Sequence, residues 1–180
     1  MRNKKIGFII FLTLFIALFC IFTYENFVKI KLICNNPVIL LFPSWHGKLN
    51  YVFSTFRSVR ITQDDIENMV EIVNDAIDSY NESRTEEVET YNNNSTYKID
   101  INQFLVDKFE MYIVQSIAVR NKNGEKEIWL NCIHKNVLDD FDNDWKRTIM
   151  LIGDGGPYFF NIKINLTKKI YYDLQVNGYA

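Results

Sequence analysis

The chain has few residues of the types that bind metal ions or that interrupt helices and strands. Its 180 residues include only two His, three Cys, three Pro and seven Gly. So few His and Cys leave no rich set of metal ligands, and no cofactor site is predicted. Scarce Gly and Pro, together with 15% aromatic residues, argue against a disordered or low-complexity chain. A net charge of −2 lacks the basic excess of a nucleic-acid-binding domain.

The first 25 residues resemble a membrane anchor. An uncharged apolar run covers residues 6–23 and follows the basic side chains of Arg2, Lys4 and Lys5. A run of this length lies at the short end of what spans a bilayer. The basic flank predicts a cytoplasmic start and an extracytoplasmic C-terminal part. The sequence therefore predicts a single-pass cell-membrane protein whose membrane contact is residues 6–23.

Two alternatives stay open for localisation. A cleaved signal peptide would give a secreted protein, but bulky residues stand where a cleavage site needs small ones. A lipid on Cys20 would give a lipoprotein, although Phe19 stands where processing prefers a small residue.

Beyond residues 1–25, the chain divides into a connecting segment and one globular domain. Residues 26–61 show no clear periodicity and hold a short apolar run between Pro37 and Pro43, which could form a peripheral strand. Residues 62–180 are long enough to bury a core. They are expected to form a single α+β domain.

A long helix is predicted to begin after Thr62. Thr62 suits the N-cap, and Asp65 stands where it can complete a capping box. The pattern fades near residue 82, and residues 83–95 are predicted to form a polar loop or a frayed turn. The apolar positions at helical spacing are Ile66, Met69, Val70, Val73, Ile77 and Tyr80.

Residues 112–134 carry the clearest hairpin signal. Asn123 and Gly124 tolerate the positive φ values of a two-residue type I′ turn. The face that carries Cys132 is expected to pack on the helix. The predicted pairs are Val119–Ile128, Ile117–Leu130, Gln115–Cys132 and Ile113–His134 on that face, and Arg120–Glu127, Ala118–Trp129, Ser116–Asn131 and Val114–Ile133 on the other.

A second hairpin is predicted near the C-terminus, with a three-residue loop at 167–169. Further strand candidates cover 97–102 and 147–152. Together, these elements predict one long helix packed on a four- to five-stranded antiparallel sheet. This is a cystatin-like arrangement, preceded by a transmembrane helix. The predicted pairs of the second hairpin are Leu166–Ile170, Ile164–Tyr172, Ile162–Leu174 and Phe160–Val176, with Lys163 opposite Asp173.

Several short stretches resemble an uncharacterised family of small bacterial exported or membrane-anchored proteins. The resemblance covers about residues 109–180 and implies no established activity. Members read Cys-Phe-Cys where this chain has Cys132-Ile133-His134, so shared thiol chemistry is not implied. The stretches are Asn123–Lys126, Ile128–Cys132, Asp154–Gly156, Phe160–Leu166, Tyr171–Leu174 and Asn177–Ala180.

Cys132 and His134 are the residues with chemical potential. Two apart on one strand, they share a face and could supply a nucleophile with its base or two metal ligands. On a face turned to the helix, however, they are more simply core residues. A disulfide between Cys34 and Cys132 also stays open.

The other face of the same hairpin supplies a candidate partner surface. Tyr112, Val114, Trp129 and Ile133 would form an aromatic and aliphatic stripe there, which is either open to a partner or covered by residues 36–56. The function expected from the sequence is a non-enzymatic, membrane-anchored extracytoplasmic module that binds a protein or another envelope component. The alternatives are a small ligand-binding or hydrolase-like domain that uses Cys132 and His134, and an immunity-type protein that neutralises a toxin.

Overall fold

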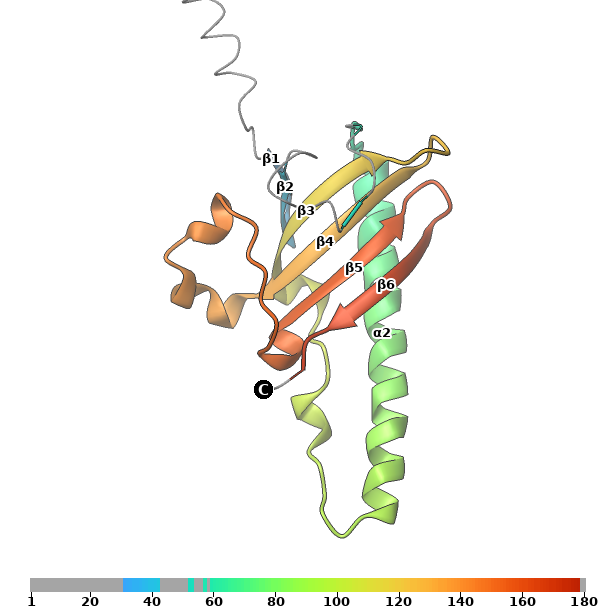
Figure 1. The fold of residues 1–180 in the computed structure, drawn as a ribbon, viewed down its shortest axis with the longest axis vertical. Helices are drawn as coiled ribbons and strands as arrows, with labels where there is room; N and C mark the ends of the chain where they lie inside the picture. The colour runs from blue at the N-terminus through green and yellow to red at the C-terminus, as the bar shows by residue number, and fades with distance from the viewer. Residues whose placement is uncertain (1–30, 43–51, 54–56, 58, 179–180) are drawn as a thin grey trace, which may run out of the picture.

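One long helix and a six-stranded sheet form an α+β fold (Figure 1). The computed structural model describes residues 31–42, 52–53, 57 and 59–178. The predicted α+β class, with one long helix beside a largely antiparallel sheet, is confirmed. The elements are β1 (Lys31–Asn35), β2 (Val38–Phe42), α2 (Gln63–Asn94), β3 (Tyr112–Arg120), β4 (Lys126–His134), β5 (Phe159–Asn165) and β6 (Ile170–Val176).

The six strands lie side by side in chain order. Every neighbouring pair is antiparallel except β2 and β3, which are parallel and are joined by the crossover that contains α2. The sequence predicted four or five antiparallel strands. The predicted strands at 97–102 and 147–152 do not form, and two other strands, β1 and β2, come from the segment 26–61. They are short and bounded by proline, so their sequence signal is weak.

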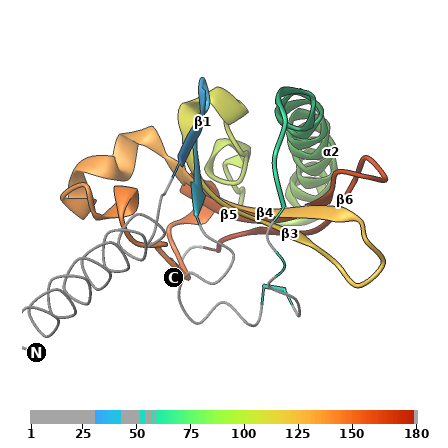
Figure 2. The ribbon, with the colours of Figure 1, turned by 90° about the horizontal axis from the view of Figure 1, so that it is seen from above.

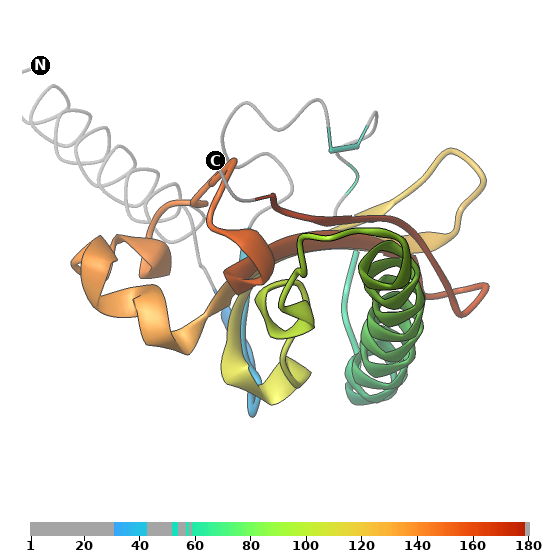
Figure 3. The same ribbon diagram turned by 90° about the horizontal axis from the view of Figure 1, so that it is seen from below.

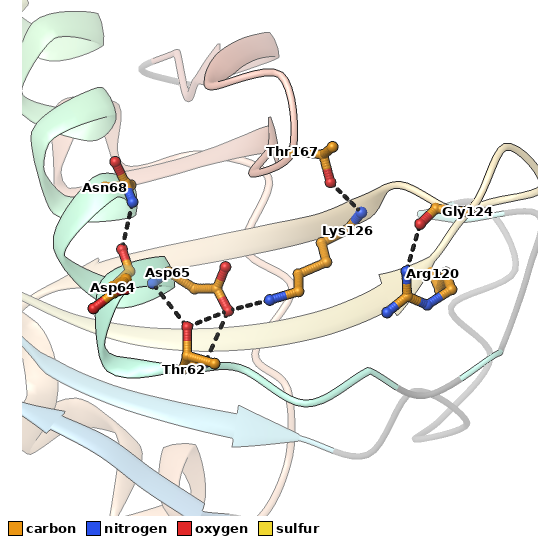
Figure 4. A network of polar contacts seen from close by, with 8 residues as sticks. All are labelled: Thr62, Asp64, Asp65, Asn68, Arg120, Gly124, Lys126 and Thr167. Carbon is orange, nitrogen blue, oxygen red and sulfur yellow. Dashed lines mark hydrogen bonds and ion pairs between the residues drawn. The ribbon is translucent and has the colours of Figure 1, made fainter.

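The N-terminus of α2 begins as predicted and is tied to β4 (Figure 4). Oγ1 of Thr62 accepts a hydrogen bond from the backbone N–H of Asp65, and Oδ2 of Asp65 accepts one from the N–H of Thr62. Nζ of Lys126, at the start of β4, lies 2.6 Å from the same Oδ2. Burial raises the pKa of Asp65, but the hydrogen bonds from Lys126 and Thr62 outweigh burial and leave it below its usual range.

The C-terminal end of α2 differs from the prediction. The helix continues to Asn94 and its second half extends beyond the end of the sheet (Figure 1). The residues that follow return along the helix on the same side of the sheet (Figures 2 and 3). The loop predicted for residues 83–95 is therefore wrong, and so is the strand predicted for 97–102, where the structure has extended chain and a 3-10 helix (Ile101–Gln103).

Two asparagines of α2 hold this return segment. The amide of Asn81 exchanges hydrogen bonds with the backbone of Val106, at 2.9 Å in both directions. The amide of Asn92 does the same with the backbone of Ile99. The return segment therefore pairs with side chains of the helix, which satisfies its backbone without a neighbouring strand and supports the polar half of α2.

The hairpin of β3 and β4 has a register one residue away from the predicted one. The loop holds three residues, because the N–H of Asn121 donates to the carbonyl of Glu125 and the N–H of Gly124 donates to the carbonyl of Asn121. Oδ1 of Asn121 also accepts from the N–H groups of Asn123 and Glu125. Gly124 has a φ of +83° and Asn123 does not have a positive φ, which fits a type I turn with a glycine bulge.

This shift of one residue in the register exchanges the two faces of β3 relative to those of β4. Ile117 and Val119 lie on the face away from α2, in a cluster with Trp129. Tyr112 and Val114 face α2 instead. The faces predicted for β4 are correct, whereas those predicted for β3 are wrong, since a shift of one residue exchanges the two faces of a strand.

The second hairpin agrees with the prediction at its far end only. Phe160 pairs with Val176 as predicted, but a bulge between Asn161 and Lys163 shifts the pairs nearer the turn. Lys163 lies opposite Tyr172 and not opposite Asp173 as predicted, but the side chains of Lys163 and Asp173 do form an ion pair, at 2.8 Å. The bulge places Asp173 at a φ of +56°.

Apolar side chains are buried on both faces of the sheet. The largest cluster lies between α2 and the strands, and includes Met69, Ile128 and Ile162. Two smaller clusters on the opposite face are centred on Trp129 and Ile133. Segments outside the strands cover these two residues, among them residues 52–53 and 137–152.

The predicted membrane anchor at residues 6–23 lies outside the described residues. Among the residues described, no helix combines the length and the apolar character that crossing a membrane requires.

Candidate functional site

The four residues predicted to form a partner surface are buried and lie on two faces of the sheet. Tyr112 and Val114 face α2, whereas Trp129 and Ile133 face away from it. Their exposed fractions are between 0% and 3%. They form no common exposed surface, because the hairpin register differs from the predicted one and other segments cover the far face.

Cys132 and His134 do share the face of β4 that packs on α2, as predicted. Cys132 is fully buried, and burial raises the pKa of its thiol well above the ordinary value. A protonated, inaccessible thiol is a poor nucleophile. Cys34 and Cys132 are both free thiols, so the disulfide left open by the sequence is not formed.

His134 makes a structural hydrogen bond with one ring nitrogen, while the other is buried beside a small pocket that this residue lines. Nδ1 accepts from the backbone N–H of Asn136 at 3.1 Å, so the neutral ring carries its proton on Nε2. Nε2 lies 3.3 Å from Oδ2 of Asp107 but has no hydrogen-bond partner. The pocket has a volume of about 110 Å³, and the rings of Tyr112 and Tyr158 lie 5.0 and 5.2 Å from the imidazole.

This arrangement does not suit a metal ion. A metal on Nε2 would need that nitrogen unprotonated, while Nδ1 is already occupied by the Asn136 N–H. No group of three or more His, Cys, Asp or Glu side chains within the described parts of the chain could hold a metal.

A larger pocket, of about 200 Å³, lies on the sheet face that turns away from α2. Asn161 and Lys163 point into it because they alternate with Ile162, which packs toward α2. We call it the sheet-face pocket. Its polar floor consists of Asn131, Asn161, Lys163, Asp173 and Gln175, and its apolar walls consist of Val52, Trp129, Leu151 and Ile152.

The floor of the sheet-face pocket combines one ion pair with amides that keep hydrogen-bonding groups available. Oδ2 of Asp173 accepts from Nζ of Lys163 at 2.8 Å, and Oδ1 accepts from Nε2 of Gln175 at 2.9 Å. The hydrogen bond from Lys163 lowers the pKa of Asp173. The amide of Asn161 has no hydrogen-bond partner among the residues that the structure describes. The floor therefore offers a ligand both hydrogen-bond donors and hydrogen-bond acceptors.

Two buried amides, which the sequence did not single out, dock the segment that forms one wall. Nε2 of Gln115 donates to the carbonyls of Trp145 and Thr148 at 2.7 and 2.6 Å. Oε1 of Gln115 accepts from the N–H of Met150 and from Nδ2 of Asn131, at 2.8 and 3.0 Å. Nδ2 of Asn131 also donates to the carbonyl of Met150.

This amide clamp corrects the strand predicted at 147–152. The backbone there bonds to side chains of β3 and β4 and forms no strand. It places Leu151 and Ile152 beside the sheet-face pocket. The sequence signal was a glutamine and an asparagine, Gln115 and Asn131, in the middle of two mostly apolar strands.

The chain matches no protein-family model, no curated protein and no solved structure. Evidence for the function therefore comes from the geometry of the described residues.

The outer face of α2 is strongly acidic. Arg84 is the only basic residue of the helix. Like charges three or four residues apart repel by roughly 0.2–0.5 kcal/mol per pair, so this face is suited to water and specifies no ligand on its own. Its exposed acids at this spacing are Asp64, Glu67, Glu71, Asp75, Asp78, Glu82, Glu86 and Glu89.

Proposed function

We propose that this chain is a non-enzymatic, membrane-anchored extracytoplasmic module, which binds a component of the cell envelope through the sheet face that turns away from α2. The observation that carries the proposal is the sheet-face pocket. Its floor holds the amide of Asn161, which has no partner in the described part of the chain, and a second amide at Gln175 with spare acceptor capacity. Concave sites with a few convergent polar groups are the usual form of a ligand site.

The anchor and the localisation are part of the same proposal. The apolar run at 6–23 with its basic flank supports attachment to the membrane, with residues 31–178 outside the cytoplasm. The resemblance to small bacterial exported or membrane-anchored proteins supports the same placement. A cystatin-like relation between α2 and the antiparallel strands also belongs to the proposal, and it implies no function by itself.

Cosedimentation with detergent-extracted cell envelopes, which hold no bilayer for residues 6–23 to enter, tests the proposal. The full-length chain, kept in mild detergent, should sediment with the envelope fraction. A variant with Asn161→Ala and Gln175→Ala should remain largely in the supernatant. Asn74→Ala, which removes an exposed amide from α2, is the matched control and should sediment like the unchanged chain. Equal sedimentation of all three proteins would refute the assignment of this face.

The catalytic alternative has less support, because Cys132 is inaccessible and His134 uses Nδ1 in a structural hydrogen bond. Alkylation of the native chain decides this point. A Cys132 that reacts at the rate of an exposed thiol would favour the hydrolase-like alternative, whereas full protection would count against it.

The immunity-type alternative would use the acidic outer face of α2 against a basic partner. An acidic stripe does not distinguish such a partner from solvent, so this alternative remains a prediction. Capture of a basic toxin domain that is lost when Glu71 and Asp78 are changed to Gln would support it.

A further inference from the structure

We propose that the sheet-face pocket binds one ring of a neutral saccharide. This inference rests on the proposed function and names the ligand class for the same site. It follows from the charge of the pocket, from its spare hydrogen-bonding groups and from its walls.

The charge of the pocket is balanced. Among the described residues that line it, Lys163 and Asp173 alone are charged, and their side chains neutralise each other at 2.8 Å. An anion at Lys163 would meet the carboxylate of Asp173, and a cation at Asp173 would meet the ammonium of Lys163. Because the opposing charge lies beside each partner, the site favours a neutral ligand over a phosphate, a carboxylate or an amine.

The spare groups require a ligand that both donates and accepts. The amide of Asn161, which bonds to none of the described residues, offers two N–H groups and a carbonyl oxygen. Lys163 has N–H groups beyond the one bonded to Asp173, and Gln175 keeps its carbonyl oxygen available. Hydroxyl groups are both donors and acceptors, so neighbouring hydroxyls on a ring can satisfy this mixed set.

The walls and the size fit a single ring. Leu151 and Ile152 present carbon atoms beside the polar floor, and Trp129 and Val52 line the pocket with 3% and 5% of their surfaces exposed. A pyranose has polar edges and apolar C–H faces, so it can contact both at once. The volume of about 200 Å³ is below the roughly 300–1,000 Å³ of pockets that enclose drug-sized ligands.

Titration of the full-length chain with chitotriose and with maltotriose, followed by tryptophan fluorescence and calorimetry, tests the inference. At least one of the two sugars should bind, and inorganic phosphate at the same concentrations should not. Asn161→Ala and Gln175→Ala should each weaken sugar binding at least tenfold. The control Asn74→Ala should bind as the unchanged chain does.

The outcomes separate the ligand class from the function. If neither sugar binds while envelope cosedimentation is still lost in the double variant, the saccharide inference is wrong and the proposed binding face stands. If phosphate binds more tightly than the sugars, the argument from balanced charge is wrong. If the sugars bind equally well to the Asn161 and Gln175 variants, the saccharide site is not this pocket.

Discussion

Replacement of Gln115 tests whether the amide clamp positions the wall of the sheet-face pocket. The side chain is fully buried and makes four hydrogen bonds, to Trp145, Thr148, Met150 and Asn131. Gln115→Met keeps the length of the side chain and removes every one of them. The variant therefore changes polar contacts with little change in packed volume.

The expected loss is about 3 kcal/mol in the free energy of unfolding. Each internal hydrogen bond contributes roughly 0.5–1.5 kcal/mol net, so four bonds give about 2–6 kcal/mol. Water can reach part of the released segment and replace some of these bonds, which favours the lower half of that range. The neighbouring Ser116 makes one hydrogen bond, to the carbonyl of Leu40, so Ser116→Ala should cost about 1 kcal/mol and serves as the control.

Equilibrium urea unfolding gives the free energies, and hydrogen exchange locates the change. The amide of Met150 should lose protection in the Gln115→Met variant, while amides of α2 should keep theirs. A loss no larger than that of Ser116→Ala, with Met150 still protected, would refute the clamp.

Three smaller predictions follow from the helix start and the glycine turn, each measured by urea unfolding. Thr62→Ala removes the N-cap bond and should cost about 1 kcal/mol; an unchanged midpoint would show that the cap is redundant. The lowered pKa of Asp65 means that its stabilising effect is present above about pH 4 and is lost as pH falls through the lowered pKa. Lys126→Met should therefore flatten the decline in stability below about pH 4, and an equally steep decline would count against the ion pair. Gly155→Ala should cost about 1–3 kcal/mol, because φ is +88° and the added Cβ would lie 2.6 Å from an aromatic ring carbon, whereas Gly153→Ala meets nothing within 4 Å and should be neutral.

The sequence predicted those parts of the fold that local chemistry decides. The capping box at Thr62 and Asp65 needs only residues three apart, and the ion pair of Lys163 with Asp173 needs only a nearby turn. Both are confirmed. The end of α2 was not predictable in this way, since Asn81 and Asn92 act through contacts with a segment that comes later in the chain.

The hairpin register failed for a different reason. When one face of a sheet is buried and the other is wet, alternation fixes the register. Here β3 and β4 are buried on both faces, from Ile128 and Leu130 toward α2 to Ile117 and Trp129 on the other side. Apolar residues on both faces carry no preference for either register. The hydrogen bonds of the Asn121 side chain then set the type of turn. The resulting shift of one residue in the register placed the four residues of the predicted partner surface on two different faces of the sheet.

The candidate site lies over the outer strands β5 and β6 because, on the face away from α2, other segments cover the central strands β3 and β4. On the face away from α2, β3 and β4 carry Ile117 and Trp129, which other segments cover. On the same face β5 carries Asn161 and Lys163, which remain partly exposed. The sheet-face pocket lies where the covered part of this face ends. A stripe of alternating polar residues on β5, which would ordinarily indicate a solvent face, therefore becomes the floor of a pocket because the clamped segment beside it supplies Leu151 and Ile152 as a wall.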